Sequence, residues 1–344
     1  MATPPRSVTI RDVAERAGVS KSLVSLVLRG APHVGEARRT AVLDAMSELG
    51  YRPNRAARAL TTARSGTVGV LLNDLRNPWF VDLLEGLTAA LHAAHLALIL
   101  ADSHTERRVG RRAVESLTGL GVDGLVVVGT TPESDAIVAA ARVLPVVLAG
   151  TREPHLPDVD VAVDDDEVGG RQATEHVLAL GHRRVAHLRG PGEVGDLRFR
   201  GFVAAMREAG FDPDRYAEPG GMSEESGYAA ARRLLARDER PTAIVAFNDL
   251  TAIGAMSAAA EHGLRVPDDL SLVGYDDTYL ARVKHISLTS VDNGNYAVGV
   301  QAGRFLVERL ADPTIPVRLF SVPTALHVRG STAAPPSCDD ARPR

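Results

Sequence analysis

The segment from Val8 to Arg29 constrains the fold most strongly, because it places two short amphipathic helices on either side of a glycine. Thr9 is a predicted helix cap, and Asp12 three residues later completes a capping box. Gly18 supplies the turn, and Ser20 is the predicted cap of the second helix. Two short helices joined in this way form a helix-turn-helix, whose second helix enters the major groove of DNA.

The apolar spacing divides each of these helices into two faces. The first helix carries its apolar residues on one face, namely Ile10, Val13, Ala14 and Ala17. The second helix is expected to bury Leu23, Val24, Val27 and Leu28. Its outer face then presents Lys21, Ser22, Ser25, Leu26 and Arg29. The pattern predicts a DNA-binding head in which this outer face meets the groove.

The charge distribution supports a nucleic-acid partner for the head alone. The chain has 39 Lys and Arg against 43 Asp and Glu, which gives a formal net charge of -4. Residues 1–66 contain 11 basic and 5 acidic residues and carry +6, so the remaining chain carries -10. A basic head on an acidic body favours phosphate binding by the head only.

Length and composition limit the classes of protein to which this chain can belong. A chain of 344 residues with 45% hydrophobic content can form two or three domains with sizeable cores. No apolar run approaches the about 20 residues of a membrane span, so we expect no membrane partner. The N-terminus lacks the apolar core of a signal peptide, and we expect a cytoplasmic protein. The single cysteine, Cys338, excludes an internal disulfide framework.

Helical signals continue for a short distance beyond the head. A third helix is expected over about 38–49 and to end at Gly50, so residues 1–50 form the predicted helix-turn-helix domain. Asn54 is the predicted cap of a very short helix over 55–60, which we expect to fold only on a partner. Residues 61–66 are a predicted linker, so that 51–66 form a hinge helix and linker.

From Thr67 onward, strand and helix patterns alternate, as in TVGVLL, a helix over about 78–94, and LALILAD. The alternation continues through GLVVV, PVVLAG, RVAHL, AIVAF and LSLVGY. This order is typical of parallel α/β sheets built from βαβ units. We therefore predict an α/β core of two doubly wound lobes over 67–330, with ligand-binding residues just after the strands. The polar residues 331–344 are expected to be disordered.

Nine blocks in the same order resemble the lac repressor family of bacterial transcriptional regulators. They are TIRDVAERAGVS, VSLVL, ELGYRPNRAARAL, VGVLLNDLRNPWF, GVDGLVVV, ATEHVLALGHRRVAHLRGP, RFRGF, FNDLTAIGAM and LSLVGYDD. The resemblance implies a homodimer that binds a palindromic DNA operator, a hinge helix in the minor groove, and a periplasmic-binding-protein-like core that holds a small effector. We place the N-lobe at about 67–165 and 293–322, and the C-lobe at about 166–292 and 323–330.

The resemblance also assigns DNA contacts. Lys21, Ser22 and Leu26 occupy base-contacting positions of the recognition helix. Phosphate or backbone contacts fall to Ser20, Ser25, Arg29 and His33, and the minor-groove positions are Asn54, Ala57 and Leu60. Leu60 would insert into the central base step. Leu26 stands where the family usually has arginine, so we predict an altered half-site, because leucine contacts a thymine methyl and does not hydrogen-bond guanine.

For the effector, the resemblance points to residues that follow the strands: Asn73, Asn77, Trp79, Phe80, Arg198, Asn248, Asp276 and Asn293. Carboxylate, guanidinium and amide groups suit a hydroxyl-rich ligand, and an aromatic ring offers it an apolar face. The chain departs from the family at Ala149, where an aspartate is common. Asn293 is a weaker candidate, because the usual glutamine-proline pair is absent there.

The leading hypothesis is a repressor that is controlled by a sugar effector. The second hypothesis is a regulator with a nucleoside or purine corepressor, and a remote alternative is a solute-binding protein without DNA function. The string Gly190 to Gly195 follows a strand, but Pro191 disrupts a phosphate turn, so we expect no nucleotide cofactor. The run Asp164 to Asp166 is expected to be a solvated loop and not a metal site. We find no catalytic constellation and expect no enzyme.

Overall fold

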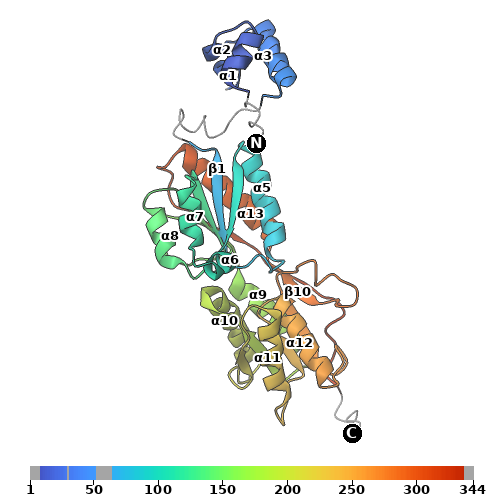
Figure 1. Ribbon diagram of the computed structural model, residues 1–344. Helices are drawn as coiled ribbons and strands as arrows, with labels where there is room; N and C mark the ends of the chain where they lie inside the picture. Colours follow the sequence, from blue (N-terminus) through green and yellow to red (C-terminus); the bar gives the residue numbers. More distant parts are fainter. Residues whose placement is uncertain (1–7, 29–30, 52–63, 337–344) are drawn as a thin grey trace. The chain divides into compact units, whose positions relative to one another are not determined.

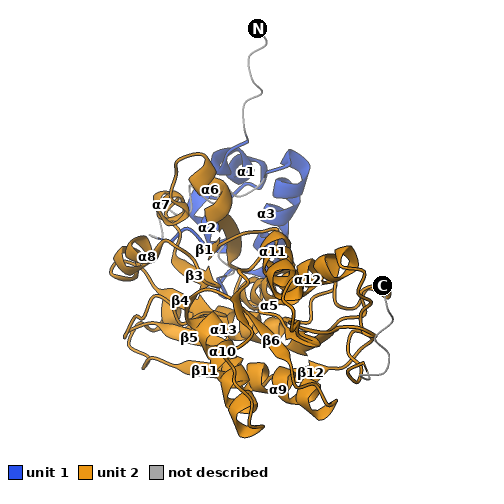
Figure 2. Ribbon diagram, turned by 90° about the horizontal axis from the view of Figure 1, so that it is seen from below, with its two compact units in different colours: residues 1–66 blue, residues 67–344 orange. Residues whose placement is uncertain are grey.

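The computed structural model describes residues 8–28, 31–51 and 64–336. The chain divides into two compact units, residues 1–66 and residues 67–344 (Figure 2). In the described part of the chain, no helix combines the length and the apolar character needed to cross a bilayer. The hinge helix predicted over 55–60 lies outside the described residues.

The first unit is a three-helix head formed by α1 (Ile10–Arg16), α2 (Lys21–Leu28) and α3 (Glu36–Leu49). The predicted capping box is confirmed: Thr9 N donates to Asp12 Oδ2 at 2.7 Å, and Asp12 N donates to Thr9 Oγ1 at 3.4 Å. Gly18 and Gly50 have φ angles of 64° and 62°, a left-handed conformation that glycine adopts without strain. The third helix begins two residues earlier than predicted.

The head has its own small apolar core. Its buried members are Val13, Ala14, Val24, Val27, Val34, Val42 and Ala45. Residues from all three helices contribute, so the inward faces predicted from the apolar spacing are the faces that pack. Lys21, Ser22 and Leu26, on the opposite face of α2, are exposed.

The second unit contains two six-stranded sheets. The N-lobe sheet has the order β11-β5-β4-β3-β1-β2 and the C-lobe sheet β12-β10-β9-β8-β6-β7. The N-lobe strands are β1 (Thr67–Leu72), β2 (Ala97–Asp102), β3 (Gly124–Val128), β4 (Val146–Ala149), β5 (Asp160–Asp164) and β11 (Leu319–Val322). The C-lobe strands are β6 (Val185–Arg189), β7 (Ala217–Pro219), β8 (Ala243–Val245), β9 (Ser271–Tyr275), β10 (Thr289–Asp292) and β12 (Ala325–His327). All pairings are parallel except β10 with β12, so the predicted doubly wound fold is confirmed.

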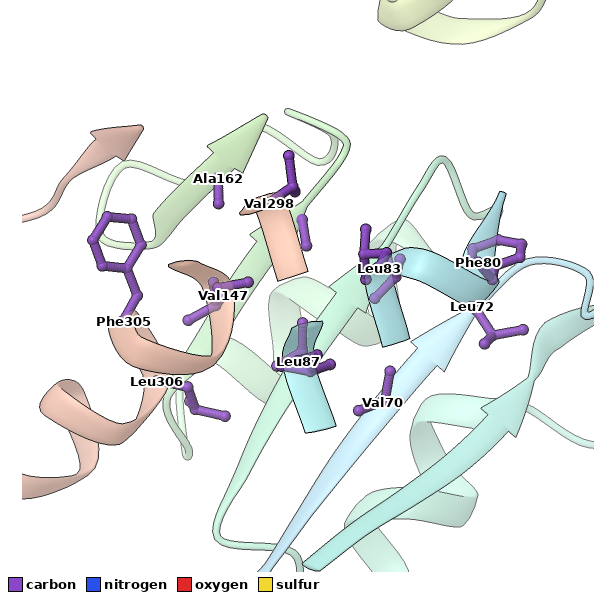
Figure 3. Close-up of a cluster of buried hydrophobic side chains, with 14 of the residues drawn as sticks. Val70, Leu72, Phe80, Leu83, Leu87, Val147, Ala162, Val298, Phe305 and Leu306 are labelled. Atoms are coloured by element: carbon purple, nitrogen blue, oxygen red, sulfur yellow. The ribbon is translucent and has the colours of Figure 1, made fainter. Parts of the chain in front are cut away.

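Helices cover both faces of each sheet. The N-lobe carries α5 (Phe80–Ala93), α6 (Ser103–Arg108), α7 (Ala113–Gly119), α8 (Ser134–Ala141) and α13 (Asn295–Ala311). The C-lobe carries α9 (Asp166–Ala179), α10 (Gly192–Glu208), α11 (Glu224–Leu235) and α12 (Asp249–Glu261). In the N-lobe core, Leu83 and Leu87 of α5 and Leu306 of α13 face the sheet residues Val70 and Val147 (Figure 3).

The chain passes between the lobes three times: from β5 to α9, from β10 to α13, and from β11 to β12. Each passage places backbone beside the carboxyl ends of strands, where α/β sheets bind ligands.

The predicted disorder of residues 331–344 is wrong for the described part of that segment. Ser331 is buried, and its Oγ donates to Leu272 O at 2.6 Å. His182 Nε2 lies 2.8 Å from Ala333 O, and Ser271 Oγ donates to the same carbonyl at 3.0 Å. Hydrogen bonds to the C-lobe therefore order this polar segment, which the composition alone does not reveal. Residues 337–344 lie outside the described residues.

Candidate functional site

The outer face of α2 is the candidate DNA-contacting surface. Lys21, Ser22 and Leu26 are exposed, with Leu26 at 39% of its full accessibility. Leu23 N donates to Ser20 Oγ at 3.2 Å, so Ser20 caps the helix as predicted. Ser25 is half-buried. The base-contacting candidates of α2 are therefore accessible to a partner.

Five further DNA candidates lie elsewhere in the head and hinge. His33 is exposed on the loop before α3. Arg29, Asn54, Ala57 and Leu60 lie outside the described residues.

In the second unit, a cavity of about 50 Å³ lies at the carboxyl ends of strands from both lobes. It is lined by Asn73, Asn77, Trp79, Phe80, Gly129, Thr130, Gly150, Val194, Arg198, Met222, Phe247, Asn248 and Asp276. Seven of the eight predicted effector residues are therefore brought together. Ligand pockets typically measure about 300–1,000 Å³, so an effector must separate the lobes or displace side chains to enter.

The N-lobe wall of this cavity is aromatic. Trp79 and Phe80 pack edge to face, with ring centroids 4.9 Å apart, and Trp79 N donates to Asn77 Oδ1 at 3.0 Å. A Cβ at Gly150 would lie 2.5 Å from the indole of Trp79. The indole thus occupies the space that a side chain at this position would need. This gives a steric reason for glycine directly after β4.

The C-lobe wall centres on Arg198, which is only 5% exposed. Its Nε donates to Asp166 Oδ1 at 3.0 Å, and its Nη1 donates to Phe247 O at 2.7 Å. Nη1 also lies 3.6 Å from Asp276 Oδ1, and the guanidinium stacks 3.5 Å from the centre of the Tyr275 ring. Two of its nitrogens are therefore held by the protein, and among the described residues no hydrogen bond is found for Nη2.

Asp276 sits on strained backbone immediately after β9. Its φ is 100°, which a residue with a side chain adopts only when its surroundings hold it there. Asn293 Nδ2 donates to Asp276 Oδ1 at 3.2 Å. Asn293 does not line the cavity, and in the described part of the chain it contacts the site only through this bond to Asp276.

Asn248 is largely committed to holding the loops around it. Its Oδ1 accepts from Thr251 N at 2.9 Å and so caps α12, while its Nδ2 donates to Met222 O at 3.1 Å. One amide hydrogen remains for an effector.

Buried carboxylates surround the arginine. Burial raises the pKa of Asp164 to about 7, with Asp166 adding to the rise and Arg198 opposing it. Burial also raises the pKa of Asp276 well above its usual range, against the pull of Arg198. Burial opposes the charge of Arg198, but the nearby acidic groups, Asp166 first, raise its pKa overall. The guanidinium therefore stays charged in a site that water barely reaches.

Two buried polar atoms of the cavity residues have no hydrogen-bond partner among the described residues, namely Trp79 Nε1 and Asn73 Oδ1. Buried polar groups are nearly always paired, so each such exception calls for an explanation. One donor and one acceptor in a cavity wall are suited to a ligand that carries hydroxyl groups.

The expectation of a solvated loop at Asp164 to Asp166 is wrong, because Asp164 and Asp166 are 4% and 2% exposed. Asp164 Oδ2 accepts from the Tyr275 hydroxyl at 2.8 Å, and Asp165 caps α9 through Val168 N at 3.2 Å. The three carboxylates therefore serve three different partners and do not converge on one ion.

Two other motifs also have structural roles. A Cβ at Gly190 would meet the Phe247 ring at 2.1 Å, and one at Gly195 would meet Gly190 O at 2.1 Å, so tight packing explains this glycine string. Carboxylates of Asp277 and Asp292 lie near His327. Asp277, however, is already paired with Arg282 and Arg329.

Sequence reasoning missed six cavity residues: Gly129, Thr130, Gly150, Val194, Met222 and Phe247. Gly129, Thr130 and Gly150 directly follow β3 and β4, so the strand-end rule alone could have found them. Met222 and Val194 carry no chemistry that marks a binding site. Asp166 was missed as a partner of Arg198 for a different reason, because nothing local in the sequence distinguishes it from Asp164 and Asp165.

Comparison with known proteins agrees with this architecture. Residues 9–54 match bacterial regulatory proteins of the lacI family, and residues 174–332 match a periplasmic binding protein-like domain. The transcriptional repressor PurR of Pectobacterium carotovorum is 33% identical over 336 residues, which cover 96% of this chain and 98% of that protein. Catabolite control protein A of Priestia megaterium is 32% identical over 95% of this chain and 99% of its own length.

Solved structures give the same result. The lac repressor dimer bound to operator and the anti-inducer ONPF matches with a TM-score of 0.81 and 29% identity, over 96% of this chain and 100% of that one. The regulator CelR in complex with cellobiose matches with a TM-score of 0.70 and 31% identity, over 94% and 99%. PurR and CelR are thus transcriptional regulators, and the lac repressor structure contains its operator. The chain belongs to the lacI family of bacterial regulatory proteins, and it is a DNA-binding transcriptional regulator with an effector-binding core.

Proposed function

We propose that this protein is a cytoplasmic repressor that binds a palindromic operator as a homodimer and responds to a neutral, hydroxyl-rich effector, a sugar. Residues 1–50 contact the major groove, residues 51–66 form the hinge, and residues 67–330 bind the effector and the second subunit. Lys21, Ser22 and Leu26 contact bases, and Leu60 inserts into the minor groove.

One arrangement carries the assignment of the effector: a charged wall opposite an aromatic one. Arg198 Nη2 and Asp276 offer a donor and an acceptor on the C-lobe side. On the N-lobe side, Trp79 offers an apolar ring face and an Nε1 that has no partner in the described part of the chain. Sugars have both hydroxyl edges and an apolar face, and such a pair of walls recognises both.

A purine or nucleoside is the second candidate. The aromatic rings of Trp79, Phe80 and Phe247 suit a flat base, and the similarity to PurR favours this class. Solution binding separates the two classes directly.

We infer that the effector controls the protein through an ion-pair cluster that connects the two lobes. Arg152 of the N-lobe and Arg198 of the C-lobe bind the same carboxylate, Asp166. An effector that engages Arg198 therefore acts on a group tied to both lobes. By linkage, an effector that favours one lobe arrangement changes operator affinity by the same factor by which operator changes effector affinity.

Intrinsic fluorescence tests the site, because Trp79 is the single tryptophan of the chain. We expect one sugar from a panel of mono- and disaccharides to change the emission of the full-length protein, and calorimetry to give the same affinity. Arg198→Gln should abolish binding, whereas the matched surface variant Arg184→Gln should retain it. Binding of purines alone would favour the second candidate. Binding without any change in emission would contradict the placement of Trp79.

A further inference from the structure

A cavity of about 740 Å³ in the C-lobe belongs to no role assigned so far. Its walls come from the segments before β6, β7 and β8 and from the ends of α11 and α12. We call it the arginine pocket, because four of the six charged side chains that line it are arginines: Arg184, Arg215, Arg237, Arg240, Asp238 and Glu239. Its volume lies within the range of small-molecule sites, about 300–1,000 Å³.

The sheet topology brings these arginines together. Arg184 directly precedes β6, Arg215 lies two residues before β7, and Arg240 lies three residues before β8. The three strands are neighbours in the order β8-β6-β7 and run parallel, so their amino ends meet at one edge of the sheet. The effector cavity lies at the opposite edge, beside the carboxyl ends of strands. The arginine pocket is therefore separate from the effector cavity.

Two of the four arginines are paired with carboxylates of the C-lobe. Arg215 pairs with Glu239, and Arg237 Nη2 lies 3.2 Å from Glu218 Oε2. Arg237 Nη1 also donates to Arg215 O at 2.9 Å. These contacts hold the wall of the pocket in place, and they account for the charges of Arg215 and Arg237.

The other two arginines form no ion pair with any described residue. Arg184 Nε donates to the backbone oxygen of Arg240 at 2.9 Å, and this bond leaves both Nη groups of Arg184 available. Arg240 attracts Asp269, but Asp269 is already paired with Arg265 at 3.1 Å. Unpaired guanidinium groups in one wall repel each other, and Asp238 offsets at most one of the two charges. The pocket is therefore suited to an added anion.

We propose that the arginine pocket is a second small-molecule site, which binds a ligand through a phosphate group. Guanidinium groups favour phosphate because their planar N–H forks match its oxygens, and Arg184 and Arg240 supply two such forks from adjoining segments. The volume is that of a site for a nucleotide or a sugar phosphate. This proposal goes beyond the proposed function and does not depend on the identity of the effector.

Calorimetry with pyrophosphate on the full-length protein is the first test, because pyrophosphate has neither a sugar nor a base for the effector cavity. We expect binding that persists at about 150 mM salt, which screens diffuse attraction between exposed charges. ATP and glucose 6-phosphate then show which carrier of the phosphate binds more tightly. If none of these three probes binds the folded protein, the proposal is wrong.

Variants locate the bound phosphate. Arg184→Gln and Arg240→Gln should each weaken pyrophosphate binding by at least about tenfold, because each removes a charged donor. Arg142→Gln is the matched control, since it removes an exposed arginine at the end of α8 in the N-lobe. Equal losses in all three variants would indicate diffuse charge attraction. Unchanged binding in the two pocket variants would place the phosphate elsewhere, and either result would overturn the proposal.

A variant with the opposite expected effect excludes misfolding as the cause of lost binding. Asp238→Asn removes the carboxylate that opposes an anion in the pocket, so it should strengthen pyrophosphate binding by about threefold. Asp158→Asn, which removes an exposed carboxylate of the N-lobe, should leave the affinity unchanged. An affinity that Asp238→Asn leaves unchanged or weakens would contradict binding in the arginine pocket.

Discussion

Asp166 Oδ1 accepts a hydrogen bond from Arg198 Nε at 3.0 Å, while its Oδ2 accepts from Arg152 Nη1, also at 3.0 Å. The two arginines belong to different lobes, and Asp166 begins α9 where the chain first passes between them. One carboxylate therefore connects the effector-facing guanidinium to both halves of the core.

Asp166→Asn should lower the free energy of unfolding by about 3 kcal/mol, because it removes a charge partner from a buried arginine. Glu167→Gln is the control, since Glu167 pairs with Arg200 at 3.2 Å on the exposed side of the same helix. An exposed pair contributes at most about 1 kcal/mol. Urea unfolding of both variants measures the difference. Equal losses of unfolding free energy would show that the buried Asp166 pair stabilises the fold no more than the exposed Glu167 pair does.

Gly254→Ala should destabilise the C-lobe by about 1–3 kcal/mol, because α11 and α12 approach each other at this glycine. A Cβ at Gly254 would lie 2.1 Å from Glu224 O, a backbone atom that moves only with its helix. Gly119→Ala is the matched helical control, because a Cβ there meets nothing within 4 Å. Thermal unfolding compares the two, and a tolerated Gly254→Ala would show that the helices separate easily.

His187→Phe should make stability less sensitive to acid. The imidazole is buried against Phe199 and Phe202, and burial first, then Arg189 and Arg198, lower its pKa from 6.5 to about 3. Below about pH 6.5 this histidine is protonated in the unfolded chain but stays neutral in the folded one. It therefore destabilises the fold as the pH falls. At pH 5 the cost is about 2 kcal/mol.

The test of this prediction is urea unfolding at about pH 7.5 and pH 5. The variant should gain about 2 kcal/mol relative to the unmodified protein on moving to the lower pH. A change of the same size in His285→Asn, which removes an exposed imidazole, would contradict the assignment to burial.

Leu26→Arg should change the operator that the protein prefers. The side chain of Leu26 is exposed on α2, and arginine there can bind guanine with two hydrogen bonds worth about 1–3 kcal/mol of discrimination. Selection from random duplexes should recover guanine at the contacted position for the variant only. If both proteins select the same half-site, Leu26 does not contact bases.

The regular part of the fold was predictable because its signals are local. Thr9 and Asp12 are three residues apart, and each long strand has a continuous apolar run. Among the strands that escaped prediction, β7 and β12 have three residues each, and β11 has three exposed residues out of four. Only their partners in the sheet determine them, and sequence periodicity does not record such partners.

The residues of the candidate site also fall into those that were predicted and those that were missed. Arg198 within α10 and Asp276 after β9 were predicted because the family resemblance assigns them, and their chemistry suits a hydroxyl-rich ligand. Gly150 and Met222 were missed because they act through shape, and Asp166 because its burial depends on two arginines distant from each other in the sequence.

The most direct test of the account is selection of bound sequences from a random duplex library with the purified full-length protein, followed by titration of the selected operator with the effector found by calorimetry. We predict a palindrome whose affinity the effector changes by the same factor by which the operator changes effector affinity. No enrichment at low salt by the folded protein, with the sugar and purine probes present, would contradict the account and favour a solute-binding protein without DNA function.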